Sequence, residues 1–211
     1  MAIFRPEETK SSGVSNFYGF TPIAILGFED KSDQFDWADL FLDVEVKQEG
    51  SDYQKSLRIA GNLEKDINGK ITGGTALKRV YGFFDVIGER AGLNVDGNWE
   101  DADGKKITNI ATHLNQAHSQ NVMPGGDLEF NFLAYVYKEK PKTTGAKVYS
   151  RVFYRIQPNT DEGRQKLEAD VKWFKSKGFI KEATEADINT PQQSVEMSAS
   201  GVRNLYCLTT L

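Results

Sequence analysis

An alternating apolar pattern between residues 38 and 60 constrains the fold of this chain most strongly. Side chains of a β-strand point alternately to opposite faces, so apolar residues at every second position mark one buried face. The segment ADLFLDVEVKQ has this spacing, the turn-forming residues EGSD follow it, and YQKSLRIAG repeats it. The pattern therefore predicts an antiparallel hairpin over 38–60. The alternating apolar residues are Leu40, Leu42, Val44, Val46, Leu57 and Ile59.

Three further segments are predicted as strands. Residues 17–28 form a short apolar run broken by Gly19 and Pro22, which fits a bent strand. The stretch NFLAYVYKEKPKTTGAKVYSRVFYRI, residues 131–156, fits two strands joined by a lysine-rich loop. Together with the first hairpin, these segments give five strands.

Two segments have helical periodicity. In TALKRVYGFFDVIGERAGL the apolar residues recur every three or four positions, which predicts an amphipathic helix that Thr75 caps and Gly92 ends. The segment TDEGRQKLEADVKWFKSKGFI predicts a second helix, capped by Thr160 and ended by Gly178. Residues 94–126 are polar, and we expect a loop there with room for one short helix.

The order of these elements is three strands, a helix, two strands and an appended helix. A five-stranded Greek-key barrel with a helix between its third and fourth strands has this order, which is that of the oligonucleotide/oligosaccharide-binding (OB) fold. We therefore predict a mainly β fold with α additions (α+β): an OB-like barrel with an extra C-terminal helix. We expect a flexible N-terminal arm over 1–16, a single OB-like domain over 17–180 with an insertion at about 94–126, and a C-terminal tail over 181–211.

Positive charge is concentrated in one part of this net-acidic chain. The whole chain carries −4, whereas residues 138–155 contain six lysines and arginines and one glutamate, a local net charge of +5. In the OB fold the loop between strands four and five, here about 138–147, flanks the binding face. A basic patch on an acidic body favours local binding of a polyanion.

The strand at 147–156 carries a ladder of cations and rings on one face. Alternation puts Val148, Ser150, Val152, Tyr154 and Ile156 on a core face and the ladder on the other. Cations meet phosphates and rings stack on bases, so such a ladder suits a single-stranded nucleic acid. The alternative is an outer face that is solvated or covered by a neighbouring helix. The ladder consists of Lys147, Tyr149, Arg151, Phe153 and Arg155.

Several neighbouring residues extend this candidate surface. Tyr135 and Tyr137 on the preceding strand either extend the aromatic platform or pack inside, and Arg58 joins from the third strand. Lysines of the loop supply further phosphate contacts. The candidate nucleic-acid-binding residues are Lys138, Lys140, Lys142, Lys147, Tyr149, Arg151, Phe153, Arg155, Tyr135, Tyr137 and Arg58.

Signals of catalysis and of metal binding are weak. The two histidines, His113 and His118, lie five residues apart, which is not a spacing for sharing a metal, and we expect them at the surface. No nucleophile has a visible base, so we expect no enzyme, no metal and no cofactor. No apolar run approaches the roughly 20 residues that a bilayer requires. One cysteine, no transmembrane span and no signal-peptide pattern favour the cytoplasm and no membrane partner.

The chain resembles single-stranded DNA-binding proteins encoded by tailed bacteriophages. The segments MAIFRPEETK, FLDVEVKQEGSDYQKSLRIAGNL, ALKRVYGFFDVIG and FNFLAYVYKEKP carry the resemblance. It implies an OB-type barrel that coats single-stranded DNA with little sequence preference during phage replication or recombination, inside an infected bacterium, with proteins of those processes as partners. Many such proteins end in a strongly acidic tail, whereas residues 182–211 hold few carboxylates.

A second function class is compatible with the same residues. Tyrosine and arginine are also enriched at protein interfaces, so the same face suits a phage structural or protein-interaction module. Salt dependence separates the two classes, because a protein interface need not lose affinity steeply with ionic strength. The sequence leaves the oligomeric state, and the choice between DNA and RNA, open.

Overall fold

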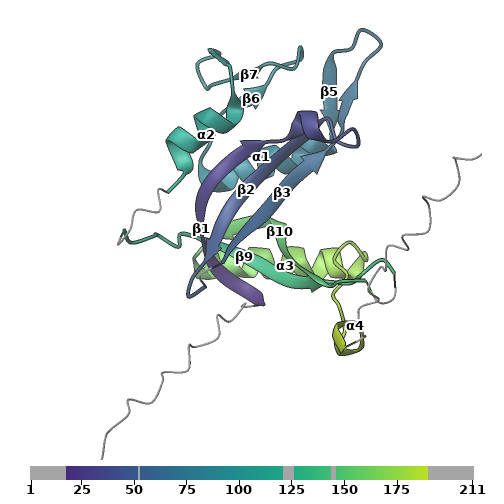
Figure 1. Ribbon diagram of the computed structural model, residues 1–211. Helices are drawn as coiled ribbons and strands as arrows, with labels where there is room; N and C mark the ends of the chain where they lie inside the picture. The colour runs from purple at the N-terminus through teal and green to yellow at the C-terminus, as the bar shows by residue number, and fades with distance from the viewer. Residues whose placement is uncertain (1–17, 52, 121–125, 144–145, 190–211) are drawn as a thin grey trace, which may run out of the picture.

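The fold is α+β and is built on one five-stranded antiparallel sheet (Figure 1). A computed structural model describes residues 18–51, 53–120, 126–143 and 146–189. The strand order is β10-β9-β1-β2-β3, and the predicted α+β class and the hairpin over 38–60 are confirmed. The strands are β1 (Gly19–Asp30), β2 (Leu40–Gln48), β3 (Gln54–Gly61), β9 (Phe132–Glu139) and β10 (Tyr149–Pro158).

Strand β1 bends the sheet, because its two halves pair with different neighbours. Its residues 19–23 pair with β9, its residues 23–30 pair with β2, and the register shifts between Ile25 and Gly27. As a result, the two edge strands β3 and β10 contact each other. Lys55 Nζ donates to Ser150 Oγ across this seam at 3.1 Å. Among the described residues no backbone ladder joins β3 to β10.

Helix α1 (Thr75–Ile87) covers the inner face of the sheet and closes the main core. Its Val80 and Phe84 pack in one buried cluster with Val44 of β2 and Ile59 of β3. Burial of this apolar face stabilises the fold by roughly 25 cal/mol per Å² of apolar surface removed from water.

Both predicted ends of α1 need correction. Gly74 is the N-cap, because the Thr75 hydroxyl instead accepts a hydrogen bond from the Asn62 backbone N–H at 3.2 Å. The helix ends at Gly88, where φ is 77°, four residues before the predicted Gly92. Glycine adopts this left-handed conformation without a Cβ clash, so Gly88 can end the helix before Gly92 is reached.

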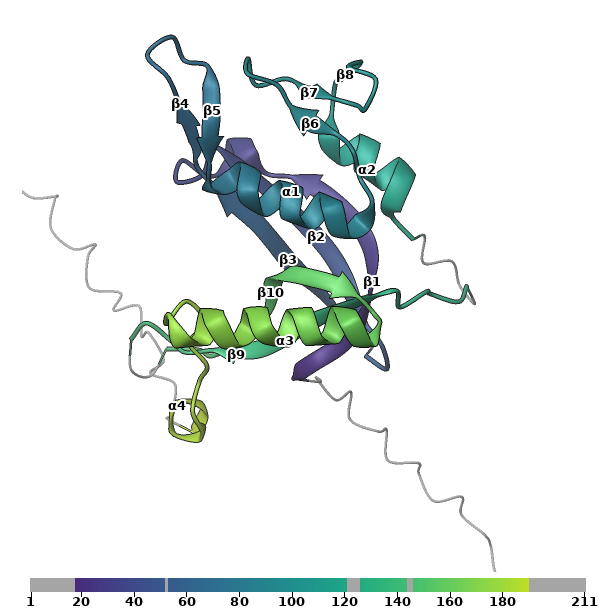
Figure 2. The same ribbon diagram turned by 180° about the vertical axis from the view of Figure 1, so that it is seen from behind.

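Helix α3 (Asp161–Ser176) covers the face of β9 and β10 that points away from the main core. As predicted, Thr160 caps it, with its hydroxyl accepting from the Gly163 N–H at 3.1 Å. Leu167 and Val171 form a second buried cluster with residues of β9 and β10. Figure 2 shows α1 and α3 on the same side of the molecule with β10 between them.

The region predicted as a loop is more regular than expected. Strands β6 (Gly92–Leu93), β7 (Trp99–Glu100) and β8 (Lys106–Ile107) form a small sheet, and α2 (Ile110–His118) is the short helix. The expected short helix is therefore present, and the difference from the prediction is the small sheet, to which this segment contributes β7 and β8. Within the described residues, no helix has the length and apolar character needed to cross a membrane. The other short elements are η1 (Ser32–Gln34), β4 (Leu63–Lys65), β5 (Ile71–Gly74) and α4 (Glu185–Asn189).

The start of the predicted tail is docked on the sheet. Glu182 forms an isolated antiparallel bridge with Glu139, and the Ala183 N–H donates to the Lys138 carbonyl at 2.8 Å. This pairing covers the end of β9 that extends past β1. The predicted arm 1–16 and tail residues 190–211 lie outside the described residues.

Candidate functional site

The predicted ladder on β10 is interrupted by an irregularity in strand pairing. Val152 lies opposite Val136 and Ile156 lies opposite Ala134, so the register shifts between them. Phe153 still lies on the face opposite Val152 and Ile156, as alternation predicts, but this face packs beneath α3, where Phe153 is 4% exposed. The prediction that Phe153 presents its ring to a ligand is wrong. The alternative of a face covered by a neighbouring helix applies to this position.

Tyr135 on β9 is also buried, at 7% exposure. Its hydroxyl donates to Glu182 and accepts from Lys175 Nζ, the latter at 2.7 Å. Burial, followed by the Glu182 carboxylate, raises the pKa of Tyr135. Tyr137 stacks on Tyr135 with ring centroids 5.9 Å apart and stays partly exposed. Of the two candidate tyrosines, Tyr135 is thus an interior residue.

The two arginines of the ladder are neutralised by carboxylates. Arg151 Nε lies 2.6 Å from a Glu139 oxygen, and Arg155 donates to Asp170 at 2.8 Å. Burial acts to lower the pKa of Arg155, but the hydrogen bonds and charges of Asp170 and Tyr154 together outweigh it, so this pKa is raised. Charge pairs of this kind fix the orientation of the guanidinium groups and reduce their net charge.

The lysine loop and Tyr149 form a patch at the outer end of β10. Tyr149 is 58% exposed, and Lys147 Nζ lies 5.5 Å from its ring centroid. Lys138 Nζ lies 5.0 Å from the ring centroid of Tyr18. Lys140 and Lys142 are exposed. This patch is accessible, and it is separate from the concave site described next.

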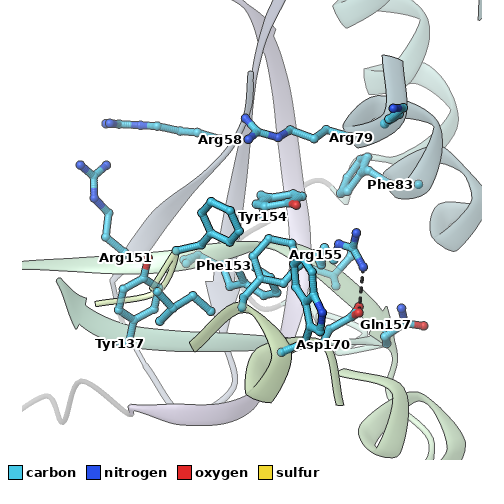
Figure 3. A pocket seen from close by; sticks show the side chains of 18 of the residues that line it. Arg58, Arg79, Phe83, Tyr137, Arg151, Phe153, Tyr154, Arg155, Gln157 and Asp170 are labelled. Carbon is cyan, nitrogen blue, oxygen red and sulfur yellow. Dashed lines mark hydrogen bonds and ion pairs between the residues drawn. The ribbon is translucent and has the colours of Figure 1, made fainter. Parts of the chain in front are cut away.

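A cleft of about 780 Å³ opens between α1 and β3 on one side and β10 and α3 on the other (Figure 3). Five cationic side chains and two carboxylates line it. The structure thus brings part of the predicted set together with residues that sequence reasoning missed. The predicted lining residues are Arg58, Tyr137, Arg151, Phe153 and Arg155, and the missed ones include Lys78, Arg79, Tyr154, Trp173, Phe174 and Phe179.

The first wall of the cleft, here called the α1 wall, consists of Arg58, Lys78 and Arg79. All three side chains are exposed. Arg79 donates to the Ala60 carbonyl, and its guanidinium lies 5.0 Å from the ring centroid of Tyr154. Figure 3 shows Arg58 and Arg79 on the opposite side of Tyr154 from Asp170. The α1 wall is therefore an accessible group of cations, of which Arg79 is held in place by its contacts with Ala60 and Tyr154.

The second wall, here called the α3 wall, consists of Trp173, Phe174 and Phe179. Trp173 is 50% exposed and Phe179 is 68% exposed, and their rings stack with centroids 6.1 Å apart at 28°. Phe174 contacts Trp173 edge-on at 4.9 Å, and Arg155 lies 5.0 Å from the ring centroid of Phe174. These contacts hold two large rings in place while leaving them accessible.

The sequence pattern gave no signal for several residues of the cleft, for identifiable physical reasons. Lys78 and Arg79 occupy the polar face of the predicted helix, but the periodicity does not show which strands that helix will cover. Tyr154 fell on the predicted core face, and the register shift of β10 turns it into the cleft. Trp173 is not part of the apolar face that Leu167 and Val171 form on its helix, so the apolar spacing did not single it out.

The two histidines converge instead of pointing to solvent. His118 Nε2 lies 2.9 Å, and His113 Nε2 3.2 Å, from the same Glu89 oxygen. Burial acts to raise the pKa of Glu89, but hydrogen bonds from the Ala91 N–H and then from His118 outweigh it, so this pKa is lowered. The cluster anchors α2 beside the end of α1. Among the described residues, no group of three or more histidine, cysteine or carboxylate side chains is arranged to hold a metal ion.

No protein-family model, curated protein or solved structure matches the chain. The resemblance to phage single-stranded DNA-binding proteins therefore stays a prediction.

Proposed function

We propose that the protein is a non-catalytic single-stranded DNA-binding protein and that the cleft is its binding site. The observation that carries this proposal is the composition of the cleft lining. Five cations face two carboxylates there, in a chain whose net charge is −4, and accessible rings lie opposite the cations. A basic groove combined with stacking platforms is the recurring solution for single-stranded nucleic acids.

The strand order supports an OB-like Greek-key barrel as the underlying fold. In the OB fold a five-stranded sheet curls until its third and fifth strands meet, and the helix sits between strands three and four. In chain order, β3 and β10 are the third and fifth strands of this sheet, and they contact each other. Helix α1 follows β3 and precedes the fourth strand, β9. The proposed site includes Arg58 on β3, and the lysine loop leads into β10 beside it.

The biological role that we propose follows from the resemblance of the sequence. The protein would coat single-stranded DNA in phage replication or recombination, in the cytoplasm of an infected bacterium. Binding through phosphates and ring stacking implies little sequence preference, because every nucleotide offers a phosphate and a base face. The accessible lysine patch around Tyr149 would extend the contact beyond the cleft.

Binding of labelled oligothymidine, followed by fluorescence anisotropy at a series of salt concentrations, tests the proposal. Neutralising about three phosphates predicts a slope of log K against log salt near −2 for a single strand. The double variant Arg58→Ala, Lys78→Ala should flatten this slope by about 1.4. Lys105→Ala removes an exposed cation of the insertion, outside the cleft, and should leave the slope unchanged.

The same experiment distinguishes DNA binding from the second candidate function, that of a phage structural or protein-interaction module. Two exposed, stacked aromatic side chains beside arginines are typical of protein interaction hot spots, which is the observation that favours it. Absence of binding to oligothymidine at low salt would contradict the DNA-binding proposal and favour this second candidate. Binding that is equally tight on duplex DNA would contradict selectivity for the single strand.

A further inference from the structure

We propose that the cleft holds a single strand in one orientation, with its phosphates along the α1 wall and its bases against the α3 wall. This inference rests on the proposed function. It adds which chemical part of the strand each wall takes, and it makes unpaired bases a requirement for full affinity.

Among the described residues that line the cleft, the cations without carboxylate partners lie on the α1 wall. Among the described residues, no carboxylate is within ion-pair distance of Arg58, Lys78 or Arg79. The two arginines of β10, by contrast, have such partners: Arg151 at 2.6 Å and Arg155 at 2.8 Å. A phosphate gains most from a cation that no carboxylate already neutralises, so the α1 wall is the stronger phosphate site.

The accessible ring surface lies on the α3 wall. Trp173 and Phe179 are half to two-thirds exposed, and Phe174 supports Trp173 from the side. Because these contacts already hold the rings, binding costs little additional side-chain entropy. A base stacks on such a ring only if its face is free, and in a duplex the neighbouring base pairs cover that face. The α3 wall therefore selects unpaired bases.

Tyr154 lies between the two walls and supports the assignment of phosphates to one wall and bases to the other. Arg79 lies 5.0 Å and Arg155 lies 5.9 Å from its ring centroid. A ring that already interacts with two guanidinium groups is a poor platform for a base, but it fixes the Arg79 cation beside the cleft. The most exposed rings that remain in the cleft for stacking are those of Trp173 and Phe179.

The test compares two labelled strands of about 12 nucleotides, oligothymidine and an abasic strand of the same length and charge. The wild-type protein should bind the abasic strand more weakly, by a factor of about 5 to 150 for each stacked base that is lost. Trp173→Ala should weaken binding of oligothymidine by a similar factor and leave binding of the abasic strand unchanged. Arg58→Ala should weaken the binding of both strands by the same factor.

Trp37→Ala is the matched control, because Trp37 is 60% exposed and does not line the cleft. It should bind both strands as the wild type does. Equal affinity of the wild type for the two strands, or equal weakening of both by Trp173→Ala, would overturn the orientation while leaving DNA binding intact. A wild-type protein that binds neither strand would instead overturn the proposed function itself.

Discussion

Replacing Phe153 by alanine distinguishes a core residue from a ligand-binding residue. Phe153 is 4% exposed, and its ring centroid lies 5.0 Å from that of Tyr154 and 5.1 Å from that of Phe174. Removing a buried phenyl group forfeits its transfer free energy and leaves a cavity between β10 and α3. We therefore expect Phe153→Ala to lower the free energy of unfolding by about 3–5 kcal/mol.

Urea unfolding followed by circular dichroism measures this change, with a similar m-value expected for both proteins. Tyr149→Ala is the control on the same strand, since its side chain is 58% exposed and its removal should change stability by no more than about 0.5 kcal/mol. The reasoning is refuted if Phe153→Ala retains wild-type stability and loses oligothymidine binding. That result would mean that Phe153 is exposed and contacts the DNA, as the predicted ladder requires.

Two further predictions concern the scaffold. The pKa of Glu89 is held below its usual 4.5 by hydrogen bonds, so its stabilising contribution is present above that pH and is lost as the pH falls through the lowered value. Glu89→Gln should thus cost about 1.5–3 kcal/mol at neutral pH and flatten the acid limb of a melting-temperature profile, and an unchanged profile would argue against the cluster. A Cβ on Gly163 would lie 2.0 Å from the Pro158 carbonyl oxygen, whereas one on Gly82 meets nothing within 4 Å. Gly163→Ala should therefore destabilise the protein by about 1–3 kcal/mol, while Gly82→Ala, in the interior of α1, should stabilise it by about 0.5–1 kcal/mol; urea unfolding that ranks the two the other way would contradict the packing at the start of α3.

The elements that the sequence predicted well are those whose signals lie within the element itself. The β2–β3 hairpin has one face on the core, so its alternation is regular and its turn is polar. The Thr160 cap and the apolar spacing of α3 are likewise local signals, and both are observed. Local chemistry was enough for these elements because no distant segment changes their geometry.

The errors arise where distant segments meet. Burial of Phe153 depends on α3, which follows it in the chain and covers the second face of β10. The register shift between Val152 and Ile156 has no glycine or proline to mark it. The cleft combines residues of β3, α1, β10 and α3, and the sequence carries no signal that brings Lys78 or Arg79 near Trp173.

Photo-crosslinking tests the central claim, that the cleft binds the single strand, most directly. Oligothymidine containing 5-iodouracil would be bound to the full chain and irradiated, and the crosslinked residues identified by peptide mass spectrometry. Crosslinks at Trp173 or Phe179, absent from a duplex control, are the predicted result. Crosslinks confined to the patch around Tyr149, with none in the cleft, would contradict the account.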